Sequence, residues 1–197
     1  MSEMEPLIPL LAVLRDLVDW LQTGRVPGVV IGGVAASFLG RPRLTRDVDV
    51  LVLLDEGRWE EFLALGARFG FLPRLPNTLT FARQTRVLLV RHEPSGIDVD
   101  ISSGTLPFEE ESIARALLVD VGGFSIPLPT PEDLIIMKAV AHRPRDLADI
   151  ESVLDTRPKL NLRRVRRWVR EFSAALEMPE ILTDLETILA QRRHRKR

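Results

Sequence analysis

Two aspartates inside an apolar strand constrain this chain more than any other feature. Asp47 and Asp49 alternate with Val48 and Val50 in a predicted strand that runs to Leu54. Residues two apart in a strand point to the same face, with their Cα atoms about 6.5–7 Å apart. The valines therefore predict a buried face, and the opposite face presents two carboxylates together.

A second predicted strand repeats this pattern. Asp98 and Asp100 alternate with Ile97, Val99 and Ile101, and they again share one face. Like charges this close raise each other's cost of ionisation unless a positive charge lies between them. A divalent cation, or a pair about 3.5–4 Å apart, is the natural counter-charge. Because Mg²⁺ prefers six oxygen ligands, a neighbouring strand is expected to supply a third carboxylate.

The composition narrows the choice of metal. The chain has no cysteine and only three scattered histidines, which excludes thiolate zinc sites and cysteine nucleophiles and disfavours a histidine site. Carboxylate ligands suit hard ions such as Mg²⁺ or Mn²⁺. The alternative is that Asp47 caps its strand and that Asp49 pairs with Arg41, Arg43 or Arg46. The repetition of the pattern favours the metal.

A glycine pair precedes the first aspartates. Gly32 and Gly33 stand between a predicted strand at 29–31 and a predicted helix at 34–39. Exposed backbone N–H groups and the helix dipole at such a turn favour a phosphate. A phosphate-binding turn followed by carboxylates on the next strand is typical of a nucleotide–Mg²⁺ site.

Length and hydropathy set the class of protein. The 197 residues suffice for one domain of good size, or for a compact domain with a helical appendage. The hydrophobic content of 45% is ordinary for a globular protein. No apolar run reaches the ~18 residues of a membrane helix, and no secretory signal is evident. We therefore expect a cytoplasmic protein without a membrane partner.

The expected order of elements is one helix, a mixed α/β core, and then helices only. This order predicts a core domain at 1–128 that includes the N-terminal helix, and a helical region at 129–197. Helices are expected at 6–23, 34–39, 59–69, 108–116, 130–140, 146–154, 162–176 and 181–192. Strands are expected at 29–31, 48–54, 79–83, 86–92, 97–102, 117–121 and 124–128, with hairpin turns at Gln84-Thr85 and Gly122-Gly123.

The net charge of −1 hides an asymmetry along the chain. The segment 159–197 holds 11 lysines and arginines against 5 acidic residues. Such a surplus is typical of a segment that contacts a polyanion such as RNA. A solvent-exposed helix face explains it equally well, because the apolar residues of the helix 162–176, Trp168 included, form one stripe. The arginines expected on the opposite face are Arg163, Arg164, Arg166, Arg167 and Arg170.

Two stretches together resemble a known family. These are "GGVAASFLGRPRLTRDVDVLV", in which thirteen residues separate Gly-Gly from Asp-x-Asp, and "LPTPEDLIIMKAVAHRPRDLADIESVL". With the later strand around Asp100, they resemble the polymerase-β nucleotidyltransferase superfamily, and within it the AbiEii-type nucleotidyltransferases. That group includes toxins of type IV toxin–antitoxin systems. The resemblance spans roughly 29–154 and implies an α/β (α+β) fold, in which helices flank a mixed, twisted sheet and a helical C-terminal part follows.

The resemblance implies a set of Mg²⁺ ligands. Asp47, Asp49 and one of Asp98 and Asp100 would hold the metal. Asp100 is favoured, because in similar sequences the third aspartate stands about as far before a segment like Pro107-Phe108-Glu109. Asp98 shares the face and is the alternative ligand, or else a partner of the ligands.

The resemblance also implies nucleotide contacts. Gly32 and Gly33 would hold the triphosphate, with Arg43 and Thr45 close to a phosphate. Lys138 would contact the nucleotide and take part in catalysis.

Asp146 matches an aspartate at the start of a helix in the same family, and the resemblance implies that it belongs to the nucleotide-binding residues with Lys138. The residues alone favour plainer roles. Lys138 would then be an exposed helix lysine, and Asp146 an N-cap with Asp149 on the same helix face.

The implied reaction is the Mg²⁺-dependent transfer of NMP from an NTP to an acceptor, with release of pyrophosphate. Asp100 is the favoured acceptor of the hydroxyl proton. RNA such as tRNA is the expected acceptor, and a cognate antitoxin is an expected partner. One alternative is an antitoxin-like minimal nucleotidyltransferase that AMPylates a HEPN-type partner protein. Another is a non-catalytic nucleotide-binding module.

Overall fold

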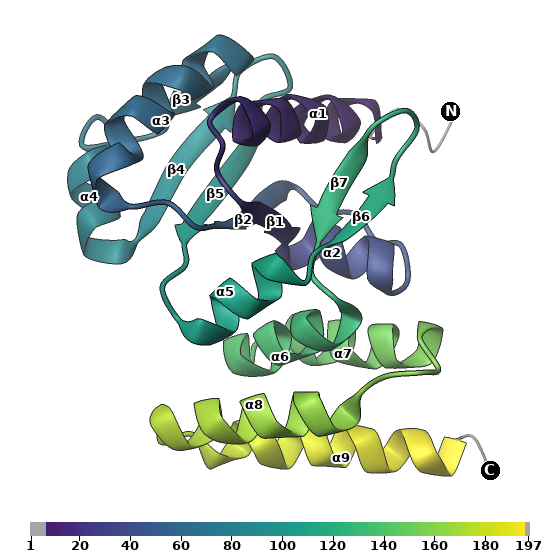
Figure 1. Cartoon of the computed structure of the whole chain (residues 1–197). Coiled ribbons are helices and arrows are strands. Elements are labelled where there is room, and N and C mark those ends of the chain that lie inside the picture. Colours follow the sequence, from purple (N-terminus) through teal and green to yellow (C-terminus); the bar gives the residue numbers. More distant parts are fainter. Residues whose placement is uncertain (1–6, 196–197) are drawn as a thin grey trace. The chain divides into compact units, whose positions relative to one another are not determined.

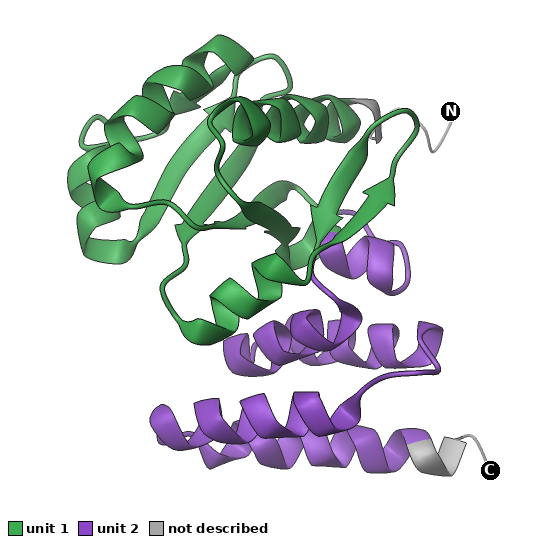
Figure 2. Ribbon diagram, viewed as in Figure 1, with its two compact units in different colours: residues 1–34, 45–128 green, residues 35–44, 129–197 purple. Residues whose placement is uncertain are grey.

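The computed structural model describes residues 7–195, and the side chains of 9–192. Figure 2 shows two compact units. Unit 1 comprises residues 1–34 and 45–128, and unit 2 comprises 35–44 and 129–197. Pro6, with which the first helix was predicted to begin, lies outside the described residues.

Unit 1 is built on a five-stranded mixed sheet of order β1-β2-β5-β4-β3 (Figure 1). β2 and β5 pair in parallel, and the other neighbours are antiparallel. The strands are β1 (Gly28–Ile31), β2 (Asp47–Val52), β3 (Phe71–Pro73), β4 (Val87–His92) and β5 (Ile97–Ser103). The parallel pair brings the two aspartate-bearing strands side by side.

One face of this sheet forms the core of unit 1. Val48, Val50, Val99 and Ile101 are at most 1% exposed, as the alternation in the sequence predicts. The helices α1 (Leu7–Thr23) and α3 (Trp59–Gly66) cover this face, and Trp20 of α1 stacks on Phe62 and Phe71. The aspartates of β2 and β5 therefore lie on the opposite face.

Shorter elements complete unit 1. A tight turn with positive φ at Gly122 and Gly123 closes the β6–β7 hairpin, as predicted. These elements are the 3-10 helices η1 (Glu56–Arg58) and η2 (Ala67–Phe69), the helices α4 (Thr78–Thr85) and α5 (Pro107–Ala114), and the strands β6 (Leu117–Asp120) and β7 (Ser125–Leu128).

The strand predicted at 79–83 is wrong, because this segment forms the helix α4. Its buried residues are Thr78 and Ala82, which are four apart and so share one helix face. Arg86 ends the helix in the left-handed region at φ 63°. β4 then pairs with β5, so the hairpin turn lies at 93–96 and not at Gln84-Thr85.

Unit 2 is helical. Thr130 caps α6, and its side chain accepts a hydrogen bond from the backbone N–H of Asp133 (3.2 Å). The four helices are α6 (Pro131–Ala141), α7 (Pro144–Thr156), α8 (Leu162–Ala175) and α9 (Pro179–Arg195). Residues 35–39 of the helix α2 (Gly32–Leu39) also belong to this unit.

The start of α7 differs from the predicted one. Arg143 and not Asp146 is the N-cap. Asp146 occupies the third helical position, where its carboxylate accepts a hydrogen bond from the backbone N–H of Arg143 (3.2 Å). Pro144 is the reason, because proline is favoured at the first helical position, which makes Arg143, three residues before Asp146, the N-cap.

The fold class is confirmed: a mixed five-stranded sheet with helices is followed by C-terminal helices. Whether the chain folds as separate domains with a boundary at 128/129 stays a prediction. None of the helices in the described part of the chain has the length and apolarity to cross a membrane.

Candidate active site

Four carboxylates lie in two rows on the open face of the sheet in unit 1. In the register of β2 and β5, Asp47 stands opposite Asp98 and Asp49 stands opposite Asp100. Paired strands lie about 4.8 Å apart, and rows along a strand repeat about every 6.5–7 Å. The pairing of the strands thus brings together all four aspartates that the sequence predicted.

Two arginines neutralise part of this cluster. Arg91 of β4 stands opposite Asp98, and its Nε lies 2.7 Å from the Asp98 Oδ1. Arg74 follows β3, and its Nη1 lies 2.9 Å from the Asp98 Oδ2. The Nη2 of Arg74 bonds to the Oδ1 of Asp100. One guanidinium therefore bridges the two carboxylates of β5.

The sequence interpretation missed both arginines. The alternation of residues within β4 predicts which residues share a face with Arg91. Only the register of the strands shows that Asp98 is its neighbour. Nothing in the sequence around Arg74 connects it with Asp100, which is 26 residues away.

The arginines divide the charges unequally. The hydrogen bond from Arg91 is the main cause that lowers the pKa of Asp98, and Arg74 adds to it. Burial raises the pKa of Asp100, and repulsion by Asp47 and Asp98 adds to this rise against the pull of Arg74. Asp100 is thus the carboxylate of β5 whose negative charge is the less well compensated.

The donor set suits a hard cation. Carboxylate oxygens on neighbouring strands are the ligands that Mg²⁺ and Mn²⁺ prefer. As the side chains stand, no three histidine or acidic groups within the described residues form a metal-binding arrangement. Asp98 and Asp100 instead direct oxygens at Arg74.

The histidines with described side chains make other contacts. His92 is buried, and its Nε2 and Nδ1 lie 2.9 Å from Asp16 and 2.8 Å from Ser95. His142 lies 3.0 Å from Asp184.

Gly32 lies directly against the carboxylate of Asp49. β1 runs antiparallel to β2 and sets Ile31 opposite Asp49, so the next residue passes the side chain closely. A Cβ on Gly32 would lie 1.8 Å from the Asp49 Oδ2, and the φ of Gly32 is +64°. Both the contact and the left-handed conformation therefore require glycine at this position.

Unit 2 holds a buried ion-pair network around Lys138. The Lys138 Nζ lies 2.8 Å from the Asp146 Oδ1 and 2.9 Å from the Asp149 Oδ2, and these residues are 5%, 1% and 4% exposed. Arg43 bonds to both oxygens of Asp149 (2.8 and 2.9 Å). Arg143 lies 2.6 Å from Asp146. Lys138 is therefore not an exposed helix lysine, and three cations face two carboxylates.

The network controls the ionisation of Asp146. Burial by itself raises the pKa of this carboxyl, but hydrogen bonds from Arg143 and Lys138 outweigh burial and lower it below the ordinary value of 3.8. The charged form of Asp146 is thus stabilised by the fold.

The Asp146→Asn variant is expected to melt at a lower temperature than the wild type at neutral pH. Because the folded pKa of Asp146 is lowered, the stability that its charge contributes is fully present above pH 3.8. This contribution is lost as the pH falls through the folded pKa. Thermal melts of both proteins from about pH 7 to pH 2 should therefore converge. A constant difference in melting temperature over this range would contradict the expectation.

Thr45 has a buried hydroxyl two residues before Asp47. Within the described part of the chain, its Oγ1 makes no hydrogen bond. Unsatisfied buried hydroxyls are costly, so this group is available to a ligand. The predicted set thus falls into two groups. Gly32, Gly33, Thr45 and the four aspartates belong to unit 1, and Arg43, Lys138, Asp146 and Asp149 belong to unit 2.

A family model of the nucleotidyl transferase AbiEii toxin of type IV toxin–antitoxin systems matches residues 15–196. The chain belongs to this family. No curated protein matches it by sequence.

Solved structures of proteins with low sequence identity share the fold of this AbiEii-family chain. The solution structure of the antibiotic-resistance factor ANT(2″)-Ia superposes with a TM-score of 0.58 at 16% identity, over 87% of this chain and 97% of that one. An antigenic nucleotidyltransferase-like protein from Paracoccidioides brasiliensis gives 0.55 at 16% identity, over 88% and 90%. The lincosamide antibiotic adenylyltransferase LnuA gives 0.50 at 15% identity, over 72% and 94%. These likenesses establish a nucleotidyltransferase fold.

The arginines of α8 in this AbiEii chain are of two kinds. Arg164 pairs with the buried Asp133 (2.7 Å), and Arg166 pairs with Glu186 (2.6 Å), so the prediction that all five face solvent is wrong for these two. Arg163, Arg167 and Arg170 are exposed, and their spacing puts them on one stripe. Trp168 is half-buried under the guanidinium of Arg167, which lies 4.9 Å from its ring centroid.

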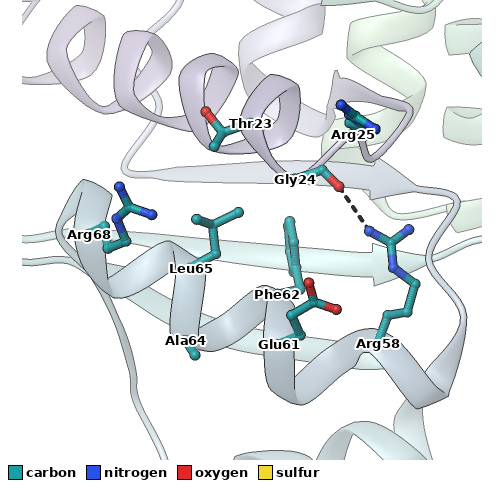
Figure 3. Close-up of a pocket in the computed structure, with 9 residues that line it drawn as sticks. All are labelled: Thr23, Gly24, Arg25, Arg58, Glu61, Phe62, Ala64, Leu65 and Arg68. Carbon is teal, nitrogen blue, oxygen red and sulfur yellow. Dashed lines mark hydrogen bonds between the residues drawn. The ribbon is translucent and has the colours of Figure 1, made fainter.

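Unit 1 also contains a hollow that is separate from the carboxylates. It has a volume of about 660 Å³ and lies between the end of α1 and α3, with Arg25, Arg58 and Arg68 among its lining residues (Figure 3). Arg58 donates a hydrogen bond to the carbonyl oxygen of Gly24 (2.9 Å). Because α1 and α3 cover the apolar face of the sheet, this hollow is on the side away from the aspartates.

Proposed function

We propose that this AbiEii-family chain is a Mg²⁺-dependent nucleotidyltransferase that transfers NMP from an NTP to RNA, with tRNA as the leading acceptor. The observation that carries the proposal is the array of four carboxylates on one sheet face, with the Gly32 backbone against Asp49. A cognate antitoxin is the partner that membership of a type IV toxin–antitoxin family implies.

Asp47, Asp49 and Asp100 are the proposed metal ligands. Asp98 already has two arginine partners, which lower the pKa of this carboxyl, and it is the less suitable ligand. Burial raises the pKa of Asp100, so this carboxylate gains most from a cation. When bound, Mg²⁺ neutralises phosphate charge and activates the attacking hydroxyl.

The chain's own residues position the reactants. In the proposed reaction the acceptor hydroxyl oxygen forms a bond to the α-phosphorus, and the bond from that phosphorus to the bridging oxygen breaks, so that pyrophosphate leaves. Asp100 accepts the hydroxyl proton. The backbone N–H groups at Gly32 and Gly33 and the hydroxyl of Thr45 bind phosphate oxygens.

The ion-pair network of unit 2 is proposed to contact the nucleotide through Lys138. Asp146 and Asp149 hold its ammonium in one orientation. Because three cations face two carboxylates, the network retains an excess positive charge that suits an anionic substrate. The family resemblance implies a nucleotide contact for Lys138 and a phosphate contact for Arg43.

A labelled-nucleotide assay tests the proposed function. Each α-labelled NTP is offered with Mg²⁺, total RNA and a cell extract, beside an Asp49→Asn control. Label on RNA with the wild-type protein only supports the proposal and identifies the nucleotide. Label on a protein would instead support the AMPylation of a HEPN-type partner. Nucleotide binding without any transfer would contradict the enzymatic role and leave a non-catalytic nucleotide-binding module.

The Gly32→Ala variant is expected to lose about 10²-fold or more in transfer rate. Its Cβ would overlap the Asp49 carboxylate, and a displacement of about 1 Å at a reacting centre costs this much. Gly122→Ala is the matched control, because its φ is also positive (+89°) but its Cβ would meet nothing within 4 Å. Initial transfer rates of the two variants measure the effect. Equal losses in both would show that only backbone strain matters.

Replacement of Arg163, Arg167 and Arg170 together by glutamine is expected to weaken RNA binding. Each lost phosphate contact should lower the slope of log K against log salt by about 0.7 to 0.9, so the slope should fall by about 2. Binding titrations of tRNA at several salt concentrations measure this. A variant with Arg25, Arg58 and Arg68 replaced by glutamine removes equal charge elsewhere. The same fall in both triple variants would argue against α8 as the RNA-contacting surface.

A further inference from the structure

The guanidinium of Arg74 bridges the two carboxylates of β5 that stand opposite the Asp-x-Asp pair. Its Nη1 bonds to Asp98 (2.9 Å) and its Nη2 bonds to Asp100. The Arg74 side chain is 23% exposed. Its Nε is buried and makes no hydrogen bond with any described residue.

Arg74 donates hydrogen bonds to the same carboxylate oxygens that would coordinate a metal ion. A guanidinium is a permanent cation whose fork of N–H donors matches carboxylate geometry. While the Asp100 Oδ1 accepts the Arg74 hydrogen bond, this oxygen is directed at the guanidinium. With the side chains in these positions, no three acidic groups among the described residues form a metal-binding arrangement.

We propose that Arg74 is a built-in counter-cation that competes with the metal for Asp100. In the metal-free protein it neutralises part of the carboxylate array, and metal binding displaces it. Arg74 thereby sets the affinity of the site for the metal. This inference rests on the proposed metal site.

The position of Arg74 suits a displaceable group. It follows β3, which has only three residues and lies at the edge of the sheet. Its backbone is fixed by a hydrogen bond from its N–H to the carbonyl oxygen of Leu89 (3.0 Å), while its long side chain has several rotatable bonds. Its unsatisfied Nε makes the bridging position costly, which favours release once another cation takes the oxygens.

Arg91 is the natural comparison. It is also an arginine beside Asp98, but it lies within β4 and no contact joins it to Asp100. Its removal lowers the positive charge near the array by the same amount. Any additional effect of removing Arg74 therefore reports competition for Asp100 and not the general electrostatic field.

The experiment measures Mn²⁺ binding by Arg74→Gln, Arg74→Lys, Arg91→Gln and the wild type, by titration calorimetry or by the electron paramagnetic resonance of free Mn²⁺. Arg74→Gln is expected to bind Mn²⁺ about tenfold more tightly than the wild type, which corresponds to about 1.4 kcal/mol. Arg91→Gln should change the affinity by less than about threefold. Arg74→Lys keeps the charge but not the bridge, and should lie between the wild type and Arg74→Gln.

Thermal unfolding gives a second readout that does not depend on activity. Without metal, Arg74→Gln should melt below the wild type, because four carboxylates then repel one another with less compensation. With saturating Mn²⁺ this difference should disappear or reverse.

The outcomes separate the two proposals. Mn²⁺ binding by the wild type with equal or weaker binding by Arg74→Gln and Arg74→Lys would overturn the role of Arg74 alone. An equal gain in Arg74→Gln and Arg91→Gln would also overturn it. No Mn²⁺ binding by any of the proteins at millimolar concentration would overturn the metal site itself, and this inference with it.

Discussion

The Asp49→Asn variant is expected to lose at least about 10³-fold of its nucleotide transfer activity while its far-UV circular dichroism stays unchanged. Asp49 lies on the central of three neighbouring strands of the candidate site. It stands opposite Asp100 on one neighbouring strand and opposite Ile31 on the other, and the backbone of Gly32 lies against its carboxylate. Asparagine keeps the shape but removes the negative charge that a metal ligand needs. The initial rate of label transfer at saturating NTP measures the loss.

Asp55→Asn is the matched control for this variant. Asp55 is exposed and follows β2 in the same unit, outside the four-carboxylate array. Its transfer rate should equal that of the wild type. Full activity of Asp49→Asn, or an equal loss in both variants, would show that the carboxylate array is not the catalytic centre.

The Lys138→Met variant is expected to lose about 3 kcal/mol or more of its free energy of unfolding, because two buried carboxylates lose a shared cation. Lys138 is 5% exposed, and its ammonium lies within 2.9 Å of both Asp146 and Asp149. Methionine fills a similar volume, so the loss reports charge and not a cavity. Urea denaturation followed by circular dichroism measures it.

Two further variants make this result specific. Lys159→Met removes a lysine from an exposed position and should leave the stability within about 0.5 kcal/mol of the wild type. The double variant Lys138→Met/Asp146→Asn removes one of the stranded carboxylates and should regain part of the loss. If the double variant is less stable than Lys138→Met by the full cost of Asp146→Asn alone, the two side chains are not coupled as the distances indicate.

The strands that carry the site were predictable, because their chemistry is local. The alternation of valine and aspartate in 47–50 fixes both the strand and its two faces, and the same holds for 97–101. Which aspartates stand opposite each other was not predictable. That depends on the parallel pairing of β2 with β5, and 44 residues of the chain lie between these two strands.

The errors came from segments whose pattern fits two structures. The alternation in 79–83 fits a strand, but burial of Thr78 and Ala82 on one side makes the segment a helix. The sequence around Lys138 also allows two interpretations, an exposed lysine or a buried one. A lysine in a helix is exposed by default, and only the approach of Asp146 and Asp149 from α7 accounts for its burial. The bridging position of Arg74 depends on the sheet order and had no local signal.

The assignment of residues 35–44 to unit 2 has a consequence for how the chain can be divided. The chain passes between the units three times, after residues 34, 44 and 128. Within unit 2, ion pairs join the segment 35–44 to α7, from Arg41 to Asp155 and from Arg43 to Asp149. The hydroxyl of Thr156 also donates a hydrogen bond to the carbonyl oxygen of Leu39.

A polypeptide that stops at residue 128 would keep this segment but lose every one of these partners. The loop that leads into Asp47 would then lack its anchors. We expect a separately expressed 129–197 fragment to restore these contacts when it is added to the shortened polypeptide.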